Sequence, residues 1–329
     1  MKNRETLDKI RPLLGLIIFS AIISILSPRF LTKSNLLNVF RQTSINAIIA
    51  AGMTFVILTS GIDLSVGSIL GFSGAVAAKM LSTGSNIILA LLVAIIIGAV
   101  AGILNGIIIT KGKVQPFIAT LAIMILLRGA TMVFTSGRPI AVPIIKTISH
   151  EAGKTITTGG GEVSPIFRWI GTGNIWSIPV PIIIMAIVFI VCYYILNHTQ
   201  FGRHIYAVGG NEEAALLSGV NTDKVKILAY TISGILAAVA GIIVTSRLSS
   251  AQPTAGDGYE LDAIAAVVLG GTSLVGGQGT VIGTIIGALI IGILNNALNL
   301  MDVQSYYQMI AKAIVILIAV LLDKKEKSK

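Results

Sequence analysis

The sequence predicts an all-α membrane protein of about ten transmembrane helices in two related halves, some of them short or broken. Of its 329 residues, 54% are hydrophobic and 12% are charged, about half the charged fraction of an average soluble domain. The mean hydropathy is +0.90. The 35 glycines agree with this class, because small residues allow transmembrane helices to approach one another closely. We expect residues 1–329 to form a single transmembrane domain without an attached soluble domain.

The predicted spans are the apolar segments that approach the length of about 20 residues needed to cross a bilayer. They lie near residues 13–27, 44–60, 66–81, 87–110, 116–135, 179–197, 225–246, 261–275, 279–300 and 304–322. The third and the eighth are short and rich in glycine, which is typical of a broken or re-entrant helix. The first follows a basic N-terminus like that of a signal peptide, but no small-residue cleavage site follows it, so we expect a retained span.

The placement of charge predicts which side of the membrane each loop faces. An even number of spans puts both termini on one side, and both termini are rich in basic residues, which places them in the cytoplasm. The polar segment at residues 198–226 then faces the cytoplasm, and the segment at residues 136–178 faces outward. The loop that holds Arg29, Lys33 and Arg41 falls on the outer side and is an exception. The net charge of +10 is therefore explained by topology rather than by nucleic-acid binding.

The chain contains an internal repeat. The stretch "GAVAGILNGIII" at residues 98–109 reappears as "GALIIGILNNAL" at residues 287–298. Upstream, "VILTSGIDLSVG" at residues 56–67 resembles "VVLGGTSLVGG" at residues 267–277. Paired repeats with short, glycine-interrupted segments are the usual architecture around a transport pathway.

Glycines spaced four residues apart accompany each copy of the repeat and predict smooth helix faces for close packing. They are Gly98, Gly102 and Gly106 in the first copy, and Gly279, Gly283 and Gly287 in the second. Asn105 and Asn295 follow these glycines, and we expect them to point into the bundle. They serve there either as interhelical hydrogen-bonding groups or as the lining of a pathway. Thr272, in the second glycine-rich stretch, is a further candidate for the pathway or for a helix break.

Asp63 is a carboxylate among apolar and small residues, and its burial at membrane depth is costly, roughly 2.5–3.5 kcal/mol at a helix centre. Ser65 and Gly67 beside it suit a helix break, where a carboxylate can accept hydrogen bonds from unpaired backbone N–H groups. We therefore expect Asp63 to cap a short turn, and a direct role in the pathway is the alternative. Arg128 is the other charge inside an apolar run, and its pairing with Asp63 is left open.

The stretch "GGNEEAALLSGVNTDKVK" at residues 209–226 predicts a short helix between two spans, from about Glu212 to Ser218. Asn211 is placed to cap it, and an apolar stripe of Ala215, Leu216 and Leu217 suits docking in the groove of a partner protein. A helix lying on lipid headgroups is less favoured, because no basic or aromatic stripe accompanies it. The candidate coupling residues are Gly210, Asn211, Glu212, Glu213, Ala215, Leu216 and Gly219.

The sequence lacks the motifs of catalysis, nucleotide binding and metal binding. It contains no G-x-x-x-x-G-K-[ST], G-x-S-x-G or H-E-x-x-H. The single cysteine, Cys192, cannot form an intrachain disulfide, and the three histidines have no metal-ligand spacing. We therefore expect no enzymatic activity, no metal site and no cofactor in this chain.

Three of these stretches together resemble the membrane permeases of bacterial ABC sugar importers, in the ribose-type branch. They are "GMTFVILTSGIDLSVGS", "GGNEEAALLSGVNTDKVK" and "DAIAAVVLGGTSLVGGQGTVIGTIIGALIIGILNNALNL", and the likeness covers residues 31–322. The resemblance implies an inner-membrane permease for a monosaccharide, with ribose favoured over xylose, galactose and autoinducer-2. It also implies two copies forming one path, a sugar-binding protein on the outer side and a separate two-cassette ATPase that binds ATP. Residues 209–219 match the family's coupling helix, which sits in a cleft of the ATPase.

Two other classes of protein remain as alternatives. A self-sufficient ion-coupled secondary transporter of a small polar solute would need several convergent intramembrane ionisable residues and no docking helix. A membrane scaffold would leave the repeated glycines without a role beyond packing. We further expect residues 136–178 to form the docking surface for the binding protein. With 6% aromatic residues, we expect no aromatic stacking site for a sugar ring.

Overall fold

The computed structural model describes residues 2–142, 150–151, 154–155, 165–304, 306–315 and 317. Within these residues the protein is all-α apart from short two-stranded ribbons, so the predicted class is confirmed. The ribbons are all antiparallel and consist of β1 (Ile140–Ala141) with β6 (Ser250–Ala251), β2 (His150–Glu151) with β3 (Lys154–Thr155), and β4 (Asn174–Ile175) with β5 (Ile178–Pro179). The β1–β6 ribbon joins the segment after the fifth helix to the segment after the tenth.

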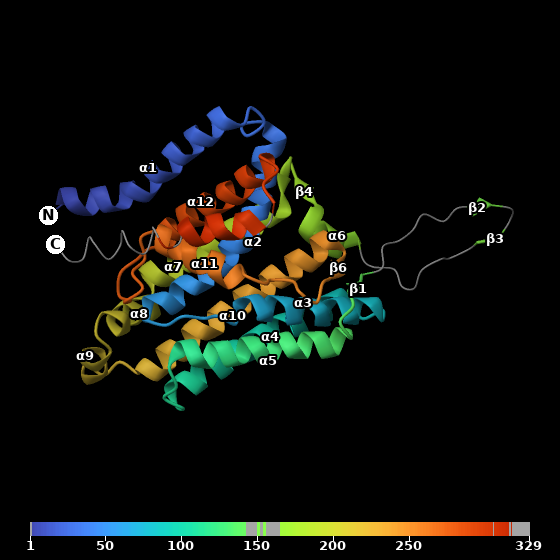
Figure 1. Ribbon diagram of the computed structural model, residues 1–329. Coiled ribbons are helices and arrows are strands. Elements are labelled where there is room, and N and C mark those ends of the chain that lie inside the picture. Colours follow the sequence, from blue (N-terminus) through green and yellow to red (C-terminus); the bar gives the residue numbers. More distant parts are fainter. Residues whose placement is uncertain are drawn as a thin grey trace.

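The helices pack together as a bundle (Figure 1) and are numbered in chain order. They are α1 (Lys2–Leu26), α2 (Lys33–Leu58), α3 (Val66–Ser82), α4 (Ile87–Thr110), α5 (Pro116–Thr135), α6 (Pro165–Thr172), α7 (Val180–His198), α8 (Gln200–Gly210), α9 (Glu212–Leu217), α10 (Thr222–Leu248), α11 (Tyr259–Leu269) and α12 (Val281–Leu300). Residues 306–315 are also helical.

Six of the described helices, α2, α4, α5, α7, α10 and α12, are long and apolar enough to cross a membrane. Both α4 and α5 begin and end at the predicted residues. By contrast, α2 begins about three turns earlier than predicted, because polar side chains in its first turns find partners within the bundle. Asn35 Nδ2, for example, donates to Asn296 Oδ1 of α12 at 3.0 Å. The eighth predicted span is shorter than expected, since α11 ends at Leu269. Gly271 then turns the backbone with φ = 83°.

The packing of the helices repeats across the two halves of the bundle. In the first half α3 packs against α4 and α10, and α4 packs along α10. In the second half α11 packs against α12 and α2, and α12 packs along α2. The stretches at residues 98–109 and 287–298 therefore lie on corresponding helices, α4 and α12. The upstream match is wrong, because residues 56–67 join α2 to α3 whereas residues 267–277 join α11 to α12.

The glycine face of α4 lies directly against the backbone of α10. A Cβ atom on Gly102 would lie 2.8 Å from the Thr231 Cα, and one on Gly106 would lie 2.6 Å from the Ile227 Cα. On α12, Gly283 and Gly287 face the last turn of α11 in the same way. Gly279 is not part of this face, contrary to the prediction, because α12 begins only at Val281.

Replacing Gly102 by alanine is expected to destabilise the bundle by about 1–3 kcal/mol, because the added methyl group must push α4 away from α10. The thermal midpoint of the detergent-solubilised protein measures this loss. Gly15→Ala is the matched control, since nothing lies within 4 Å of a Cβ at Gly15 on α1. Equal midpoints for the two variants would contradict the close packing of α4 on α10.

The bundle has two distinct ends (Figure 1). One end, called here the α9 end, carries α8, α9, the start of α10 and the start of α1, whereas β1, β6 and α6 lie at the opposite end. An ion pair of 2.5 Å between Lys111 Nζ and Asp223 Oδ2 joins the end of α4 to the first turn of α10 at the α9 end. Basic residues of α8 and α10, such as Arg203 and Lys224, gather there too.

Candidate functional site

A short capped helix lies where the sequence predicts one. It is α9, which ends at Leu217, one residue before the predicted end. The Asn211 side chain starts it by accepting a hydrogen bond of 2.9 Å from the Ala214 backbone N–H. After the helix, Gly219 turns the chain with φ = 84°, a left-handed conformation that favours glycine. We call α8 and α9 together the coupling hairpin.

The structure divides the residues of the predicted apolar stripe between an exposed face and a buried face of α9. Leu216 and Leu217 are 59% and 84% exposed and project away from the bundle. Ala215 is only 5% exposed and packs into the hydrophobic core, so its assignment to the docking stripe is wrong. The physical reason is that one side of this short helix packs against the bundle, and Ala215 lies on that side. Glu213, Gly210 and Gly219 are exposed.

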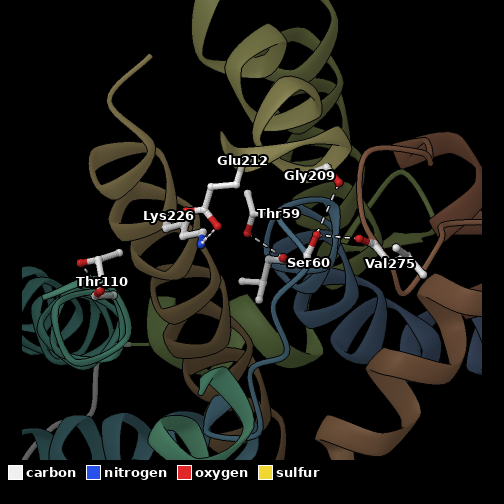
Figure 2. Close-up of polar contacts among 9 residues, drawn as sticks. Thr59, Ser60, Thr110, Gly209, Glu212, Lys226 and Val275 are labelled. Carbon is white, nitrogen blue, oxygen red and sulfur yellow. Dashed lines mark hydrogen bonds and ion pairs between the residues drawn. The ribbon is translucent and has the colours of Figure 1, made fainter. Parts of the chain in front are cut away.

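An ion pair fastens α9 to the next spanning helix. Glu212 Oε2 lies 2.6 Å from Lys226 Nζ of α10, as Figure 2 shows. The lysine side chain is 19% exposed and the glutamate side chain 48% exposed, so solvent partly screens the pair. The pair therefore connects α9 to the start of α10.

The coupling hairpin also touches two turns, residues 59–65 between α2 and α3, and the glycine-rich residues 270–280 between α11 and α12. Ser60 Oγ donates to the Val275 carbonyl at 2.6 Å and lies 3.5 Å from the Gly209 carbonyl (Figure 2). Ser60 itself has φ = 63°, which fixes the sharp turn after α2. This hydroxyl therefore links both turns to the end of α8.

Backbone and side-chain hydrogen bonds complete this junction. The Gly277 N–H donates to the Leu58 carbonyl at 3.0 Å, and the Tyr206 hydroxyl on α8 donates to the Gly279 carbonyl at 2.9 Å. Burial raises the pKa of Tyr206, so its hydroxyl keeps the proton that it donates. A Cβ on Gly209 would overlap the Leu58 carbonyl, so only glycine allows the hairpin to approach so closely. We call Leu58, Ser60, Gly209 and Gly277 the junction.

Asp63 lies at the centre of a buried polar network and is 0% exposed. Its Oδ1 accepts hydrogen bonds from the Ser65 backbone N–H at 3.0 Å and from Ser65 Oγ at 2.6 Å. Its Oδ2 accepts from Ser233 Oγ of α10 at 2.8 Å. Asn105 Nδ2 of α4 donates to Ser65 Oγ at 2.8 Å. The network therefore ties the break before α3 to both α4 and α10.

The carboxylate of Asp63 satisfies a backbone N–H at the start of α3, although the residue at the N-cap position is Ser65. Its negative charge also faces the positive end of the α3 dipole. Arg128 does not pair with it; Arg128 Nη1 donates to the Ala255 carbonyl at 2.8 Å. Ser233 was missed in the sequence analysis, because a serine in the middle of an apolar span carries no local sign of a partner 170 positions away.

The remaining candidates lie apart from this network. Gly67 allows the first turn of α3 to approach the chain before α11, since a Cβ there would lie 3.2 Å from the Gly256 carbonyl carbon. Thr272 is buried against Gly279 near the junction, and its hydroxyl has no hydrogen-bond partner among the described residues. Asn295 lines a separate cavity. Of the predicted residues, Asp63, Ser65 and Asn105 belong to the buried network. Gly67, Thr272 and Asn295 do not.

Within the part of the chain that the structure describes, no three His, Cys, Asp or Glu side chains are grouped to hold a metal ion. Cys192 is buried in α7, and burial is the ordinary environment of a free cysteine in a hydrophobic core.

Comparison with known proteins matches the chain to one protein family and to several named permeases. The family described as the permease component of the branched-chain amino acid transport system matches residues 35–320. The chain is 59% identical over 313 residues to the ribose import permease protein RbsC of Haemophilus influenzae, covering 95% of this chain and 92% of that protein. It is 54% identical over 322 residues to RbsC of Bacillus subtilis, covering 98% and 94%.

More distant relatives share the full length as well. The D-allose transport system permease protein AlsC of Escherichia coli is 36% identical over 319 residues, covering 96% of this chain and 92% of that protein. No solved structure matches the chain. Because the family match covers most of the chain and the relatives align over nearly their whole length, the chain belongs to the branched-chain amino acid transport system permease component family.

Proposed function

We propose that this chain is the transmembrane permease subunit of an ABC importer that translocates a monosaccharide, ribose, into the bacterial cell. The observation that carries the proposal is the identity of 54–59% to proteins named ribose import permeases, over at least 95% of this chain. Relatives named for D-allose and xylose are only 35–36% identical. The protein is a multi-pass protein of the inner membrane and a transport subunit rather than an enzyme.

The partners follow from the same proposal. A two-cassette ATPase binds ATP and receives α9 in a cleft on the cytoplasmic side, so this chain itself needs no cofactor. The exposed Leu216 and Leu217 support this docking, because apolar anchors on a helix are typical of binding in a groove. A sugar-binding protein docks on the outer side against residues 136–178, of which residues 143–149, 152–153 and 156–164 lie outside the described residues. Two copies of the chain form one path.

The topology completes the proposal. The chain crosses the membrane about ten times, with α1, α3, α11 and the helix at residues 306–315 adding to the six long helices. The α9 end is cytoplasmic, and both termini lie on that side. The basic residues at that end support this orientation.

A self-sufficient ion-coupled secondary transporter is the alternative. Such a protein needs intramembrane ionisable groups that bind and release the coupling ion. The groups that hydrogen-bond to Asp63 are hydroxyls and a backbone N–H, which suits a structural role better than ion release. This geometry supports the ATP-driven importer.

The test of the proposed function is ribose uptake by proteoliposomes that contain the chain, the ATPase and the binding protein. We expect uptake only with internal ATP and with all three proteins present. Uptake by the chain alone, driven by an ion gradient, would establish the secondary transporter instead.

The docking of α9 predicts the effect of a double variant. Leu216→Glu with Leu217→Glu is expected to weaken association with the ATPase about tenfold or more, because each exposed apolar anchor becomes a charge. Co-purification in mild detergent measures it. Leu31→Glu, at a leucine 62% exposed in the loop between α1 and α2, is the matched control and should not affect association. Undiminished co-purification of the double variant would show that α9 is not the docking helix.

A further inference from the structure

A polar cavity lies between α2, α11, α12 and the helix at residues 306–315. Its volume is about 280 Å³, just below the ~300–1,000 Å³ typical of small-molecule sites. Carboxamides dominate its wall; they are Gln42, Asn46, Asn295, Asn299 and Gln308. A cavity of this size and polarity accommodates one small, hydrophilic molecule.

Two polar atoms in this wall have no partner. Thr43 Oγ1 and Asn295 Oδ1 are buried and make no hydrogen bond among the described residues. Thr43 is 2% exposed, and its hydroxyl lies directly against Gly292, since a Cβ there would overlap the Thr43 Oγ1. Burying an unpaired polar group costs about 1–3 kcal/mol, so such atoms indicate a place where a ligand or water supplies the missing bond.

The cavity is lined by two cations, Arg247 and Lys312, and by one carboxylate, Asp262. Asp262 Oδ2 pairs with Lys312 Nζ at 3.0 Å and also accepts from Asn46 Nδ2 at 3.2 Å. The ion pair and the amide together fix one wall and leave one positive charge in the lining, that of Arg247. Arg247 and the Tyr259 ring complete the lining.

This chemistry matches an uncharged ligand rich in hydroxyl groups. A carboxamide offers both donors and acceptors, and each hydroxyl of a sugar is also both donor and acceptor. An anion would be favoured by several unpaired cations, whereas one of the two cations in the lining, Lys312, is already paired. A monosaccharide satisfies Thr43 and Asn295 without bringing an uncompensated charge into the membrane.

The cavity also lies on the side of the bundle that the sugar reaches first in the proposed transport. Gln42 and Thr43 are in the first half of α2, and the last residue of α2, Leu58, is part of the junction at the α9 end. The cavity is therefore in the half of the bundle opposite α9, away from the ATPase and towards the binding protein.

We propose that this cavity binds a free monosaccharide after its release from the binding protein, with Thr43 and Asn295 contributing hydrogen bonds. The inference rests on the proposed function, because that function supplies ribose as the sugar. It adds a sugar site within the permease itself, distinct from the Asp63 network and from the junction.

The direct test uses the single native cysteine of the chain. In a Cys192→Ala background, Gln42→Cys places a thiol in the cavity wall, and the rate of its modification by a methanethiosulfonate reagent is measured in the permease–ATPase complex. D-Ribose at ten times its dissociation constant is expected to slow modification about tenfold, by simple occupancy. Ser34→Cys, exposed at the start of α2 outside the cavity, is the control and should be unaffected. Sucrose, which is larger, controls for solution effects.

A second measurement tests the proposal without the cysteine at position 42. Thr43→Val removes the hydroxyl but keeps the shape of the side chain, and Thr43→Ser keeps the hydroxyl. We expect Thr43→Val to reduce ribose uptake roughly fivefold to tenfold while the binding protein still stimulates ATP hydrolysis, and Thr43→Ser to restore uptake. A purely structural role for Thr43 would instead lower uptake and stimulated ATP hydrolysis together.

The outcomes separate this inference from the proposed function. If the Cys192→Ala complex takes up ribose but about 100 mM ribose leaves Gln42→Cys modification unchanged, the cavity proposal is overturned and the importer stands, because even a site with a dissociation constant of about 10 mM would then be mostly occupied. If the complex takes up no ribose, the proposed function is overturned, and the cavity proposal with it. Ribose-specific protection together with the Thr43 pattern supports the site.

Discussion

Replacing Asp63 by leucine is expected to prevent the permease from folding stably in the membrane. The leucine would leave the Ser65 N–H, the Ser65 hydroxyl and the Ser233 hydroxyl without their acceptor. Each unpaired buried group costs about 1–3 kcal/mol, and the sum is a large part of the ~5–15 kcal/mol that stabilises a typical protein. The break before α3 would also lose the Asp63–Ser233 hydrogen bond to α10.

Asp63→Asn is expected to be tolerated far better than Asp63→Leu. The amide oxygen can still accept from Ser65, and the amide NH₂ can donate to Ser233 Oγ once that hydroxyl turns to accept. The yield of monodisperse protein in detergent and its thermal midpoint measure both variants. The control is the same pair of substitutions at Asp257, an exposed residue, where we expect little change. Equal loss for Asp63→Asn and Asp63→Leu would show that the charge itself is needed and would favour a role in the pathway.

Gly209→Ala is expected to uncouple ATP hydrolysis from sugar uptake. A Cβ at this position would overlap the Leu58 carbonyl and lie 2.5 Å from the Gly277 backbone nitrogen. The methyl group would therefore push the coupling hairpin away from both the α2–α3 turn and the α11–α12 turn. The junction is the place where α8 meets the α2–α3 turn and the α11–α12 turn together, so movement of α9 would no longer reach either turn.

The expected loss in uptake per ATP hydrolysed is roughly 5–150-fold, the range of a coupling free energy of about 1–3 kcal/mol. Gly210→Ala is a close control, since it is the adjacent glycine of the same helix and nothing lies within 4 Å of a Cβ there. Uptake and ATP hydrolysis are measured together in proteoliposomes. If Gly209→Ala transports as efficiently as Gly210→Ala, the junction does not carry the coupling.

The sequence alone determined the class of the protein and its local elements. The apolar segments at residues 87–110 and 116–135 are helices with the predicted bounds, because a span must be continuous, apolar and about 20 residues long. The short helix α9 was also predictable, because its cap, Asn211, and its terminating Gly219 act on the backbone within a few residues. The glycine face of α4 was readable because residues four apart lie on one side of a helix.

Only the tertiary structure decided which residues meet across the bundle. It paired Asp63 with Ser233, turned Ala215 into the core, and placed Asn295 and Thr43 in one cavity. None of these contacts is encoded by a local pattern, because the lipid surroundings make most faces of a span apolar and hide the direction in which a polar residue points. Local hydrogen bonds and hydrophobic length shape each element, whereas the partners of a buried hydroxyl or amide depend on how distant helices pack.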